Sequence, residues 1–228
     1  MIRVTENFRK IQDLLAQAAA EAGRKSEEIR LLAVSKKKPA DLVLAAVEAG
    51  QRDFGENFVQ EGLKKMDETG RHDLIWHFVG HLQANKTKPV AERFQWVHTI
   101  DRLKIAERLS RQRPQSVRHL NVCIQVNIDE EEAKAGVAAA DVPELARAVY
   151  ELPGLKLRGL MCIPAIRHGF EEQRKPFAKM RLLADSLRES GIDIDTLSMG
   201  MTADYRAAIH EGATIVRIGT ALFGARNG

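Results

Sequence analysis

Three consecutive lysines, Lys36, Lys37 and Lys38, follow a short apolar run at residues 31–34 of the sequence LLAVSKKKP. This run, closed by Pro39, is typical of a strand buried on both faces. The lysines then lie at the carboxyl end of the strand, the edge where parallel sheets carry ligands. A lysine held partly out of water beside other cations has a lowered pKa, and its neutral amine attacks carbonyl groups. The stretch fits Schiff-base chemistry, but a solvated strand end is the simpler interpretation.

The alternation of side chains along a strand separates the first two lysines. Lys36 shares a face with Leu32 and Val34. Lys37 falls on the opposite face, with Ser35. Because alternation does not say which face is the interior, other residues must decide whether a phosphate or carbonyl ligand belongs beside Lys36.

A second group of residues suited to ligand binding lies near the end of the chain. The last two predicted strands end in Gly200, Thr202, Arg217, Gly219, Thr220 and Gly224. Parallel barrels frequently bind phosphate after strands seven and eight, through backbone N–H groups and a helix N-terminus. Glycine lets the backbone approach an anion, while hydroxyl groups and arginine bind it. Ordinary barrel turns explain the glycines equally well.

A lysine and a phosphate site at the mouth of one barrel suit a phosphorylated aldehyde. Pyridoxal 5′-phosphate (PLP) fits, with Lys36 as the aldimine lysine and Asn57 and His77 lining the pocket. His77 taken alone is more typical of a hydrogen-bonded core histidine. A phosphorylated-sugar aldolase is the alternative, and it needs a further acid or base, for which Asp101 is only a loose candidate.

Strands and helices that position these residues alternate along the chain. Strands are predicted at 31–34, 53–57, 74–80, 96–100, 121–128, 155–164, 196–201 and 213–223, and helices at 5–22, 39–50, 58–68, 103–112, 142–152 and 175–190, with others ending near 94 and 211. Strict alternation favours parallel strands, and eight strands close a barrel. The predicted fold is an α/β TIM (β/α)8 barrel with an extra N-terminal helix. An open doubly wound sheet is the alternative, but no GxGxxG turn follows the first strand.

The composition bounds the class of protein. The 228 residues, 44% hydrophobic and 29% charged, are typical of a globular chain, and we predict a single domain over residues 1–228. No apolar run is long enough to cross a bilayer. The first residues, MIRVTENFRKIQ, lack the apolar core of a signal peptide, so we predict a cytoplasmic protein without membrane contact.

Metal, disulfide and nucleic-acid patterns are not found in the sequence. Cys123 and Cys162 lie in apolar runs, and we predict that both are buried and reduced. The seven histidines show no HExxH or comparable spacing, so no metal site is predicted. The 35 basic residues only mildly exceed the 31 acidic ones, and we find no nucleic-acid recognition motif.

Eight motifs together resemble a known family. They are LLAVSKKKP (31–39), FGENFVQE (54–61), WHFVGHLQANK (76–86), HTIDR (98–102), QVNI (125–128), RGLMCIP (158–164), LSMGMTADYRAAI (197–209) and VRIGTALFG (216–224). With them, the chain resembles the pyridoxal phosphate homeostasis proteins, the PLP-binding family typified by bacterial YggS and its eukaryotic counterpart PROSC. The resemblance covers essentially the whole chain.

This resemblance implies a barrel like the N-terminal domain of alanine racemase. It matches Lys36 to the lysine that carries PLP as an aldimine. It also implies a phosphate cradle formed by Ser198, Met199, Gly200, Thr202, Arg217, Gly219 and Thr220. The family usually has serine in place of Thr202, which keeps the hydroxyl group. It usually has proline in place of His81, and often threonine in place of Lys37.

The family resemblance also implies a protein of vitamin B6 metabolism that stores, buffers or delivers PLP, and so indirectly affects amino-acid and keto-acid pools. A PLP racemase needs a base on each face of the cofactor, and neither Tyr150 nor Tyr205 is an evident second base. Two hypotheses follow: a PLP carrier without efficient turnover, whose partners include PLP-dependent apoenzymes, and a PLP-dependent amino-acid racemase acting with the barrel domain alone. Without a second domain, we predict a monomer.

Overall fold

Eight parallel strands close into a barrel in the computed structural model, which describes residues 2–131 and 135–225. They are β1 (Arg30–Val34), β2 (Asp53–Glu56), β3 (Ile75–Phe78), β4 (Trp96–Ile100), β5 (Leu120–Asn127), β7 (Leu155–Cys162), β8 (Thr196–Ser198) and β9 (Ile215–Ile218). Strands pair with their neighbours along the chain, and pairing of β1 with β9 completes the ring. The predicted barrel is confirmed.

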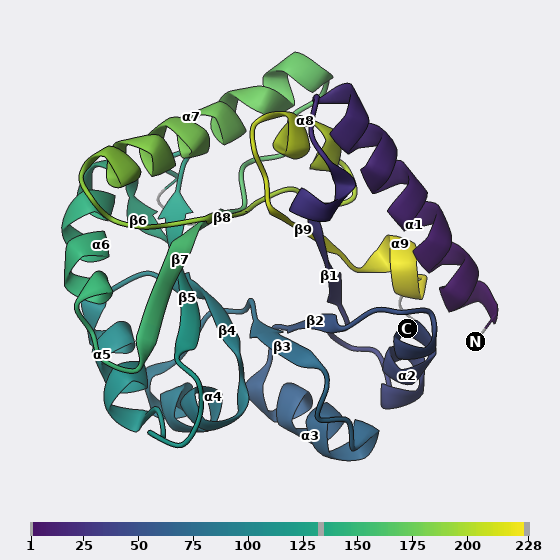
Figure 1. Ribbon diagram of the computed structural model, residues 1–228, viewed down its shortest axis with the longest axis horizontal. Coiled ribbons are helices and arrows are strands. Elements are labelled where there is room, and N and C mark those ends of the chain that lie inside the picture. The colour runs from purple at the N-terminus through teal and green to yellow at the C-terminus, as the bar shows by residue number, and fades with distance from the viewer. Residues whose placement is uncertain (1, 132–134, 226–228) are drawn as a thin grey trace.

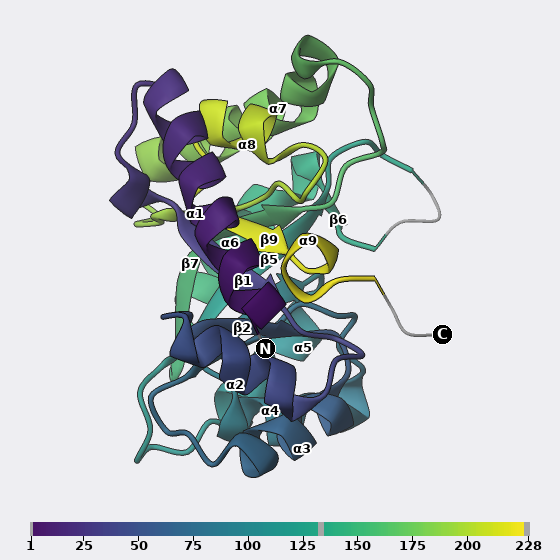
Figure 2. The same ribbon diagram turned by 90° about the vertical axis from the view of Figure 1, so that its right-hand side faces the viewer.

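Helices surround the ring of strands (Figure 1). They are α1 (Ile2–Glu21), α2 (Ala40–Glu48), α3 (Val59–Thr69), α4 (Thr87–Arg93), α5 (Leu103–Gln112), α6 (Val142–Tyr150), α7 (Phe170–Glu189), α8 (Tyr205–His210) and α9 (Thr220–Phe223), with 3-10 turns at Ser26–Glu28, Ala84–Lys86 and Ala139–Asp141. The extra N-terminal helix was predicted, and α1 packs against α2, α8 and α9. In the side view of Figure 2, the short yellow α9 follows directly after the β9 arrow.

Apolar side chains form two layers, one on each side of the barrel wall. Leu32 belongs to a small cluster inside the barrel with Trp96 and Met161. Leu31 and Ala33 belong to the large cluster between strands and helices. The face of β1 that Lys36 would share therefore points to the barrel interior, which the sequence alone left open.

Two predicted elements differ from the structure. The stretch predicted as a strand at 213–223 contains β9 and then α9, because Gly219 ends the strand and the chain turns into a helix at Thr220. Helix α7 begins at Phe170, before the predicted residue 175, and Pro176 lies within it, although proline is best tolerated in a first turn. A two-residue strand, β6 (Val137–Ala138), was not predicted and pairs with β5. Across the described ranges, no helix has the length and apolar character that a membrane span requires.

Candidate functional site

A pocket of about 260 Å³ lies where the carboxyl ends of β1, β2 and β9 meet. We call it the lysine pocket. Its walls are formed by Val34, Lys36, Asn57, Val79, Ile163, Met201, Thr202, Arg217, Gly219 and Thr220. The chain places these residues together because parallel strands all present their carboxyl ends to one face of a barrel.

Six of the ten residues predicted to bind a cofactor line the lysine pocket. They are Lys36, Asn57, Thr202, Arg217, Gly219 and Thr220. The other four, His77, Ser198, Met199 and Gly200, do not form its walls. Ser198 and Met199 are fully buried, and His77 lies in the barrel interior. Gly200 accepts a backbone hydrogen bond from the Arg217 N–H through its carbonyl. His77, Ser198 and Met199 are therefore buried outside the walls of the pocket.

Thr202, Gly219 and Thr220 give the pocket hydroxyl groups and an accessible backbone. Gly219 stands between the end of β9 and the first residue of α9. A Cβ atom at this position would lie 3.1 Å from the Val34 carbonyl oxygen, so a side chain would crowd the end of β1. Glycine therefore lets β9 pass close to β1 and leaves the backbone open toward the pocket. Backbone N–H and hydroxyl groups of this kind suit a phosphate.

Asn57 carries a buried acceptor at the pocket wall. Its Oδ1 atom is buried and has no hydrogen-bond partner in the part of the chain that the structure describes. The backbone of Gly80 packs so closely on Asn57 that no side chain fits there, and Gly80 is itself fixed by the Thr99 hydroxyl at 2.7 Å. Buried polar atoms are nearly always paired, so the Oδ1 atom of Asn57 is an exception beside the pocket.

Arg217 is the innermost charged residue of the pocket and belongs to a hydrogen-bonded chain inside the barrel. Its guanidinium donates to the Ser198 hydroxyl at 2.9 Å. Ser198 Oγ lies 2.8 Å from His98 Nδ1, and His98 Nε2 lies 2.9 Å from His77 Nδ1. His77 Nε2 lies 3.0 Å from Asp53 Oδ1 at the far end of the barrel. We call these five residues the histidine chain.

Burial favours the neutral form of both histidines in this chain. Burial lowers the pKa of His98 well below 6.5, helped by its neighbours His77 and Arg217. Burial also lowers the pKa of His77, although Asp53 opposes the shift. A guanidinium only donates and a carboxylate only accepts, so every hydrogen in the chain points from Arg217 toward Asp53. His77 is thus a hydrogen-bonded core histidine, the simpler of its two interpretations.

The turn that carries Lys36 is held by a second polar cluster, outside the barrel wall. Lys65 Nζ, on α3, lies 2.6 Å from Glu56 Oε1 and 2.7 Å from Glu61 Oε1. It also donates to the carbonyl oxygen of Ser35 at 2.6 Å, and the Ser35 hydroxyl donates to Glu56 Oε1. We call Ser35, Glu56, Glu61 and Lys65 the glutamate–lysine cluster.

The glutamate–lysine cluster and the hydrogen bonds of His98 were not predicted from the sequence. The signal for Lys65 was its position, because it shares the buried face of α3 with Val59, Gly62 and Met66. A lysine on an apolar helix face requires a buried partner. Glu56 gives the matching signal as the last residue of a buried strand.

Cys123 and Cys162 are buried and not joined in a disulfide. Burial raises the pKa of each thiol to about 12, so neither supplies a thiolate nucleophile at neutral pH. Asp101, the loose candidate for an additional acid or base, does not line the lysine pocket. It lies beside Arg102 and His81. Within residues 2–131 and 135–225, no cluster of three histidine, cysteine or acidic residues is arranged to hold a metal ion.

Comparisons with known proteins show which family the chain resembles along its length. The family model "Alanine racemase, N-terminal domain" matches residues 4–227. The pyridoxal phosphate homeostasis protein of Pseudomonas aeruginosa is 53% identical over 227 residues, which cover 100% of this chain and 97% of the relative.

Two solved structures extend the comparison. The structure of PipY from Synechococcus elongatus with PLP bound is 37% identical, has a TM-score of 0.80, and covers 92% of this chain and 100% of PipY. Alanine racemase from Corynebacterium glutamicum is 15% identical, with a TM-score of 0.74, covering 100% of this chain and 62% of the racemase. At that identity, the racemase shows a shared fold alone.

Proposed function

This chain belongs to the family of pyridoxal phosphate homeostasis proteins, and we propose that the lysine pocket is where it holds PLP. The observation that carries this proposal is one pocket that joins Lys36 to Thr202, Gly219 and Thr220. Lys36 supplies the amine that bonds to the aldehyde of the cofactor. The hydroxyl and backbone groups of the other three residues receive its phosphate.

The pocket fits a compact, charged cofactor. Ligand pockets typically measure about 300–1,000 Å³, and this one, at about 260 Å³, lies just below that range. Its walls combine one lysine, one arginine and two threonines with Val79 and Ile163 as apolar surface. Bound PLP supplies a reactive aldehyde and an electron-withdrawing ring. Asn57 adds a polar side chain to the same walls.

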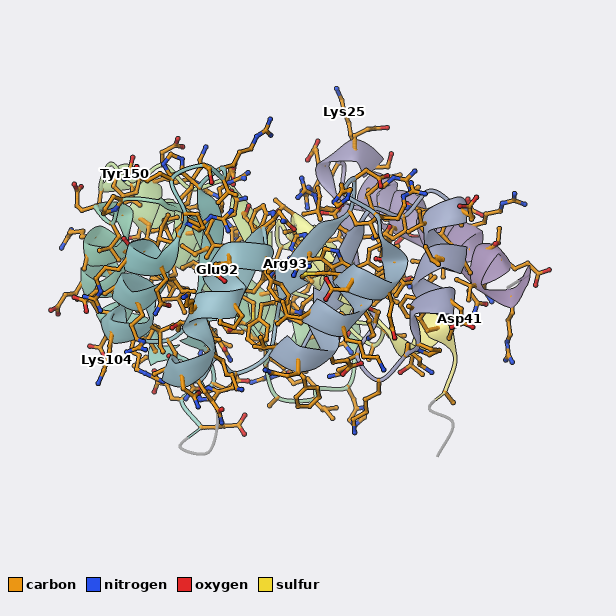
Figure 3. The ribbon with its side chains drawn as sticks, turned by 90° about the horizontal axis from the view of Figure 1, so that it is seen from below. Lys25, Asp41, Glu92, Arg93, Lys104 and Tyr150 are labelled. Atoms are coloured by element: carbon orange, nitrogen blue, oxygen red, sulfur yellow. The ribbon has the colours of Figure 1, made fainter. Side chains whose placement is uncertain are left out.

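We propose that the protein is a carrier that stores, buffers or delivers PLP. Lys36 and Arg217 are the titratable side chains that line the pocket in the described structure, and a guanidinium does not accept a proton at neutral pH. Tyr150 lies at the edge of the molecule on α6, 44% exposed (Figure 3). Tyr205 packs beside α1, away from the lysine pocket. The walls therefore favour holding PLP over racemisation, which needs two bases.

The remaining expectations belong to the same proposal. Residues 1–228 act as one PLP-binding domain, of which residues 1, 132–134 and 226–228 lie outside the described structure. The protein works as a cytoplasmic monomer, and its further partners are PLP-dependent apoenzymes. Transfer to an apoenzyme is measured by activation of a PLP-free transaminase mixed with the PLP-loaded protein.

The central test is covalent labelling of the lysine. The purified protein is charged with PLP, reduced with borohydride and mapped by peptide mass. We expect the pyridoxyl label on Lys36, and its loss in Lys36→Ala but not in Lys38→Ala. Labelling of another lysine in the unmodified protein would overturn the assignment of Lys36. Exchange of the α-proton of added amino acids with solvent would favour the racemase instead.

A further inference from the structure

Lys36 lies in a tight turn whose two flanking peptide groups are both fixed. The N–H of Lys38 donates to the carbonyl oxygen of Ser35 at 3.0 Å, which closes the turn from Ser35 to Lys38. Lys37 adopts a φ of +58°, a left-handed conformation that non-glycine residues rarely take. A lysine holds this conformation only when its surroundings impose it. The turn therefore needs anchors beyond its own hydrogen bond.

The glutamate–lysine cluster supplies these anchors on both sides of Lys36. Before Lys36, the Ser35 carbonyl accepts from Lys65 Nζ at 2.6 Å, and the Ser35 hydroxyl donates to Glu56. After Lys36, the backbone N–H of Lys37 donates to Glu61 Oε1. That same Glu61 oxygen also accepts from Lys65 Nζ. One ammonium group thus links the residue before Lys36 to the residue after it.

Stability alone does not account for this arrangement. The side chains of Lys65 and Glu56 are 4% and 0% exposed, and Glu56 Oε2 has no hydrogen-bond partner within the described ranges. Buried ion pairs often stabilise a fold no better than apolar residues of similar volume, because both charges lose their hydration. A buried ion pair with one unpaired carboxylate oxygen stabilises the packing of α3 on β2 poorly. Its clear structural effect is to fix the geometry of the turn.

We propose that Lys65, Glu56 and Glu61 are positioning residues that aim Lys36 into the lysine pocket. The proposal rests on the proposed function, since it takes Lys36 as the residue that bonds to the aldehyde of PLP. Lys65 itself does not line the pocket, so it acts through the turn and not through contact with the ligand. The amine of Lys36 is then held where it can react with the aldehyde of bound PLP. A displacement of a reacting group by about 1 Å can slow a reaction by about 100-fold.

The test compares two ligands that share a phosphate and a ring. PLP has the aldehyde, and pyridoxine 5′-phosphate has an alcohol in its place and cannot bond to Lys36. Dissociation constants for both are measured by equilibrium dialysis. In Lys65→Met we expect PLP binding to weaken about tenfold or more, while pyridoxine 5′-phosphate changes less than about twofold. The rate of pyridoxyl labelling of Lys36 should fall in parallel.

Lys64→Met is the matched control, because Lys64 is the neighbouring lysine on α3 and forms an exposed pair with Glu68. It should bind both ligands as the unmodified protein does. Glu61→Ala covers the case in which Lys65→Met does not fold, since it leaves the buried pair of Lys65 and Glu56 in place. It should also reduce PLP binding selectively, by about threefold to tenfold.

Two outcomes overturn the inference. In one, Lys65→Met and Glu61→Ala weaken both ligands equally, which a general loosening of the fold would cause. In the other, both variants bind PLP as Lys64→Met does. Lys36→Ala separates these failures from failure of the proposed function. If it keeps the preference for PLP over pyridoxine 5′-phosphate, the assignment of Lys36 is wrong. If it loses the preference while Lys65→Met keeps it, only the positioning role is wrong.

Discussion

Two buried polar networks approach the lysine pocket from opposite sides of the barrel wall. The histidine chain runs inside the barrel and ends on Arg217. The glutamate–lysine cluster lies outside the wall, between β2 and α3, and ends on the turn of Lys36. The first joins one cation, Arg217, to one anion, Asp53, through neutral side chains, whereas the second places two carboxylates around the single ammonium of Lys65.

Because of this difference, the two networks change their contributions to folding stability in opposite directions with pH. Burial lowers the pKa of His98 and His77, so the unfolded chain binds their protons first as the pH falls below about 6.5. The stability that the histidine chain contributes is complete above pH 6.5 and is lost on acidification. Burial raises the pKa of Glu56 above 4.5, although Lys65 opposes the shift. The contribution of Glu56 is complete below pH 4.5 and is lost as the pH rises through its raised pKa. The two networks therefore oppose one another in mild acid.

Removing the charge of Arg217, at the end of the histidine chain, should lower the unfolding free energy more than any other change considered. Arg217→Met deletes three hydrogen bonds, to the Ser198 carbonyl, the Ser198 hydroxyl and the Cys162 carbonyl. Each bond to a charged donor contributes about 1.5–3 kcal/mol, so we expect a loss of at least about 3 kcal/mol in unfolding free energy, measured by urea denaturation. Arg206→Met, at an exposed pair with Glu21, should change it by less than about 0.5 kcal/mol. Equal losses in both variants would show that the three buried hydrogen bonds of Arg217 stabilise the fold no more than an exposed ion pair does.

His98→Gln should lower the unfolding free energy by an amount that depends on pH. Glutamine donates and accepts but does not titrate, so it interrupts the chain at pH 8 at a cost of about 1–3 kcal/mol. Below pH 6.5 the stability difference between the unmodified protein and the variant should shrink. The unmodified protein loses stability there because the pKa of buried His98 is lowered, and the variant has no such group. Each such group changes stability by up to about 1.4 kcal/mol per pH unit. Denaturation at pH 8, 6.5 and 5.5 measures this, and a constant cost across the three values would contradict the neutral state of His98.

Glu56→Gln should shift stability in the opposite direction with pH. The neutral amide keeps an oxygen for Lys65 and Ser35 and removes the carboxylate that burial disfavours. The free-energy difference between the unmodified protein and the variant should fall as the pH rises above 4.5, by at most about 1.4 kcal/mol per pH unit. The same denaturation series at pH 4.5, 5.5 and 7 checks the sign. A difference that grows with pH would mean that Lys65 holds the pKa of Glu56 below 4.5 instead.

The barrel was predictable from sequence because its strands are buried on both faces and read as separate apolar runs. Parallel strands at 31–34 and 96–100 needed no partner to be recognised. The run ATIVRIGTALF was read as one strand because α9 is as apolar as β9, and only the Gly219 backbone separates them. The strand β6 has two residues, too few for any periodicity.

The two networks differ in how far the sequence could reveal them. Lys36 and Thr220 were found because strand ends converge on one face of a barrel, and both line the lysine pocket. The contact between His77 and His98 depends on how β3 pairs with β4, which no local pattern encodes. Lys65 reads as half of a solvated lysine pair with Lys64 until the buried face of α3 is known. The sequence therefore predicted which single residues lie at strand ends. It did not predict which side chains from different elements contact one another.

The smallest expected effect lies at Thr202, which borders the pocket and belongs to neither network. Thr202→Ser keeps the hydroxyl group, so PLP should bind within about twofold of the unmodified protein. Thr202→Val keeps the shape and removes the hydroxyl, and the loss of one hydrogen bond of about 0.5–1.5 kcal/mol weakens binding by about twofold to tenfold. Because this group faces the phosphate, pyridoxine 5′-phosphate should weaken by the same factor as PLP. Changes at Lys65 are expected to separate the two ligands and changes at Thr202 to affect them together, so a selective loss of PLP in Thr202→Val would place Thr202 beside the aldehyde.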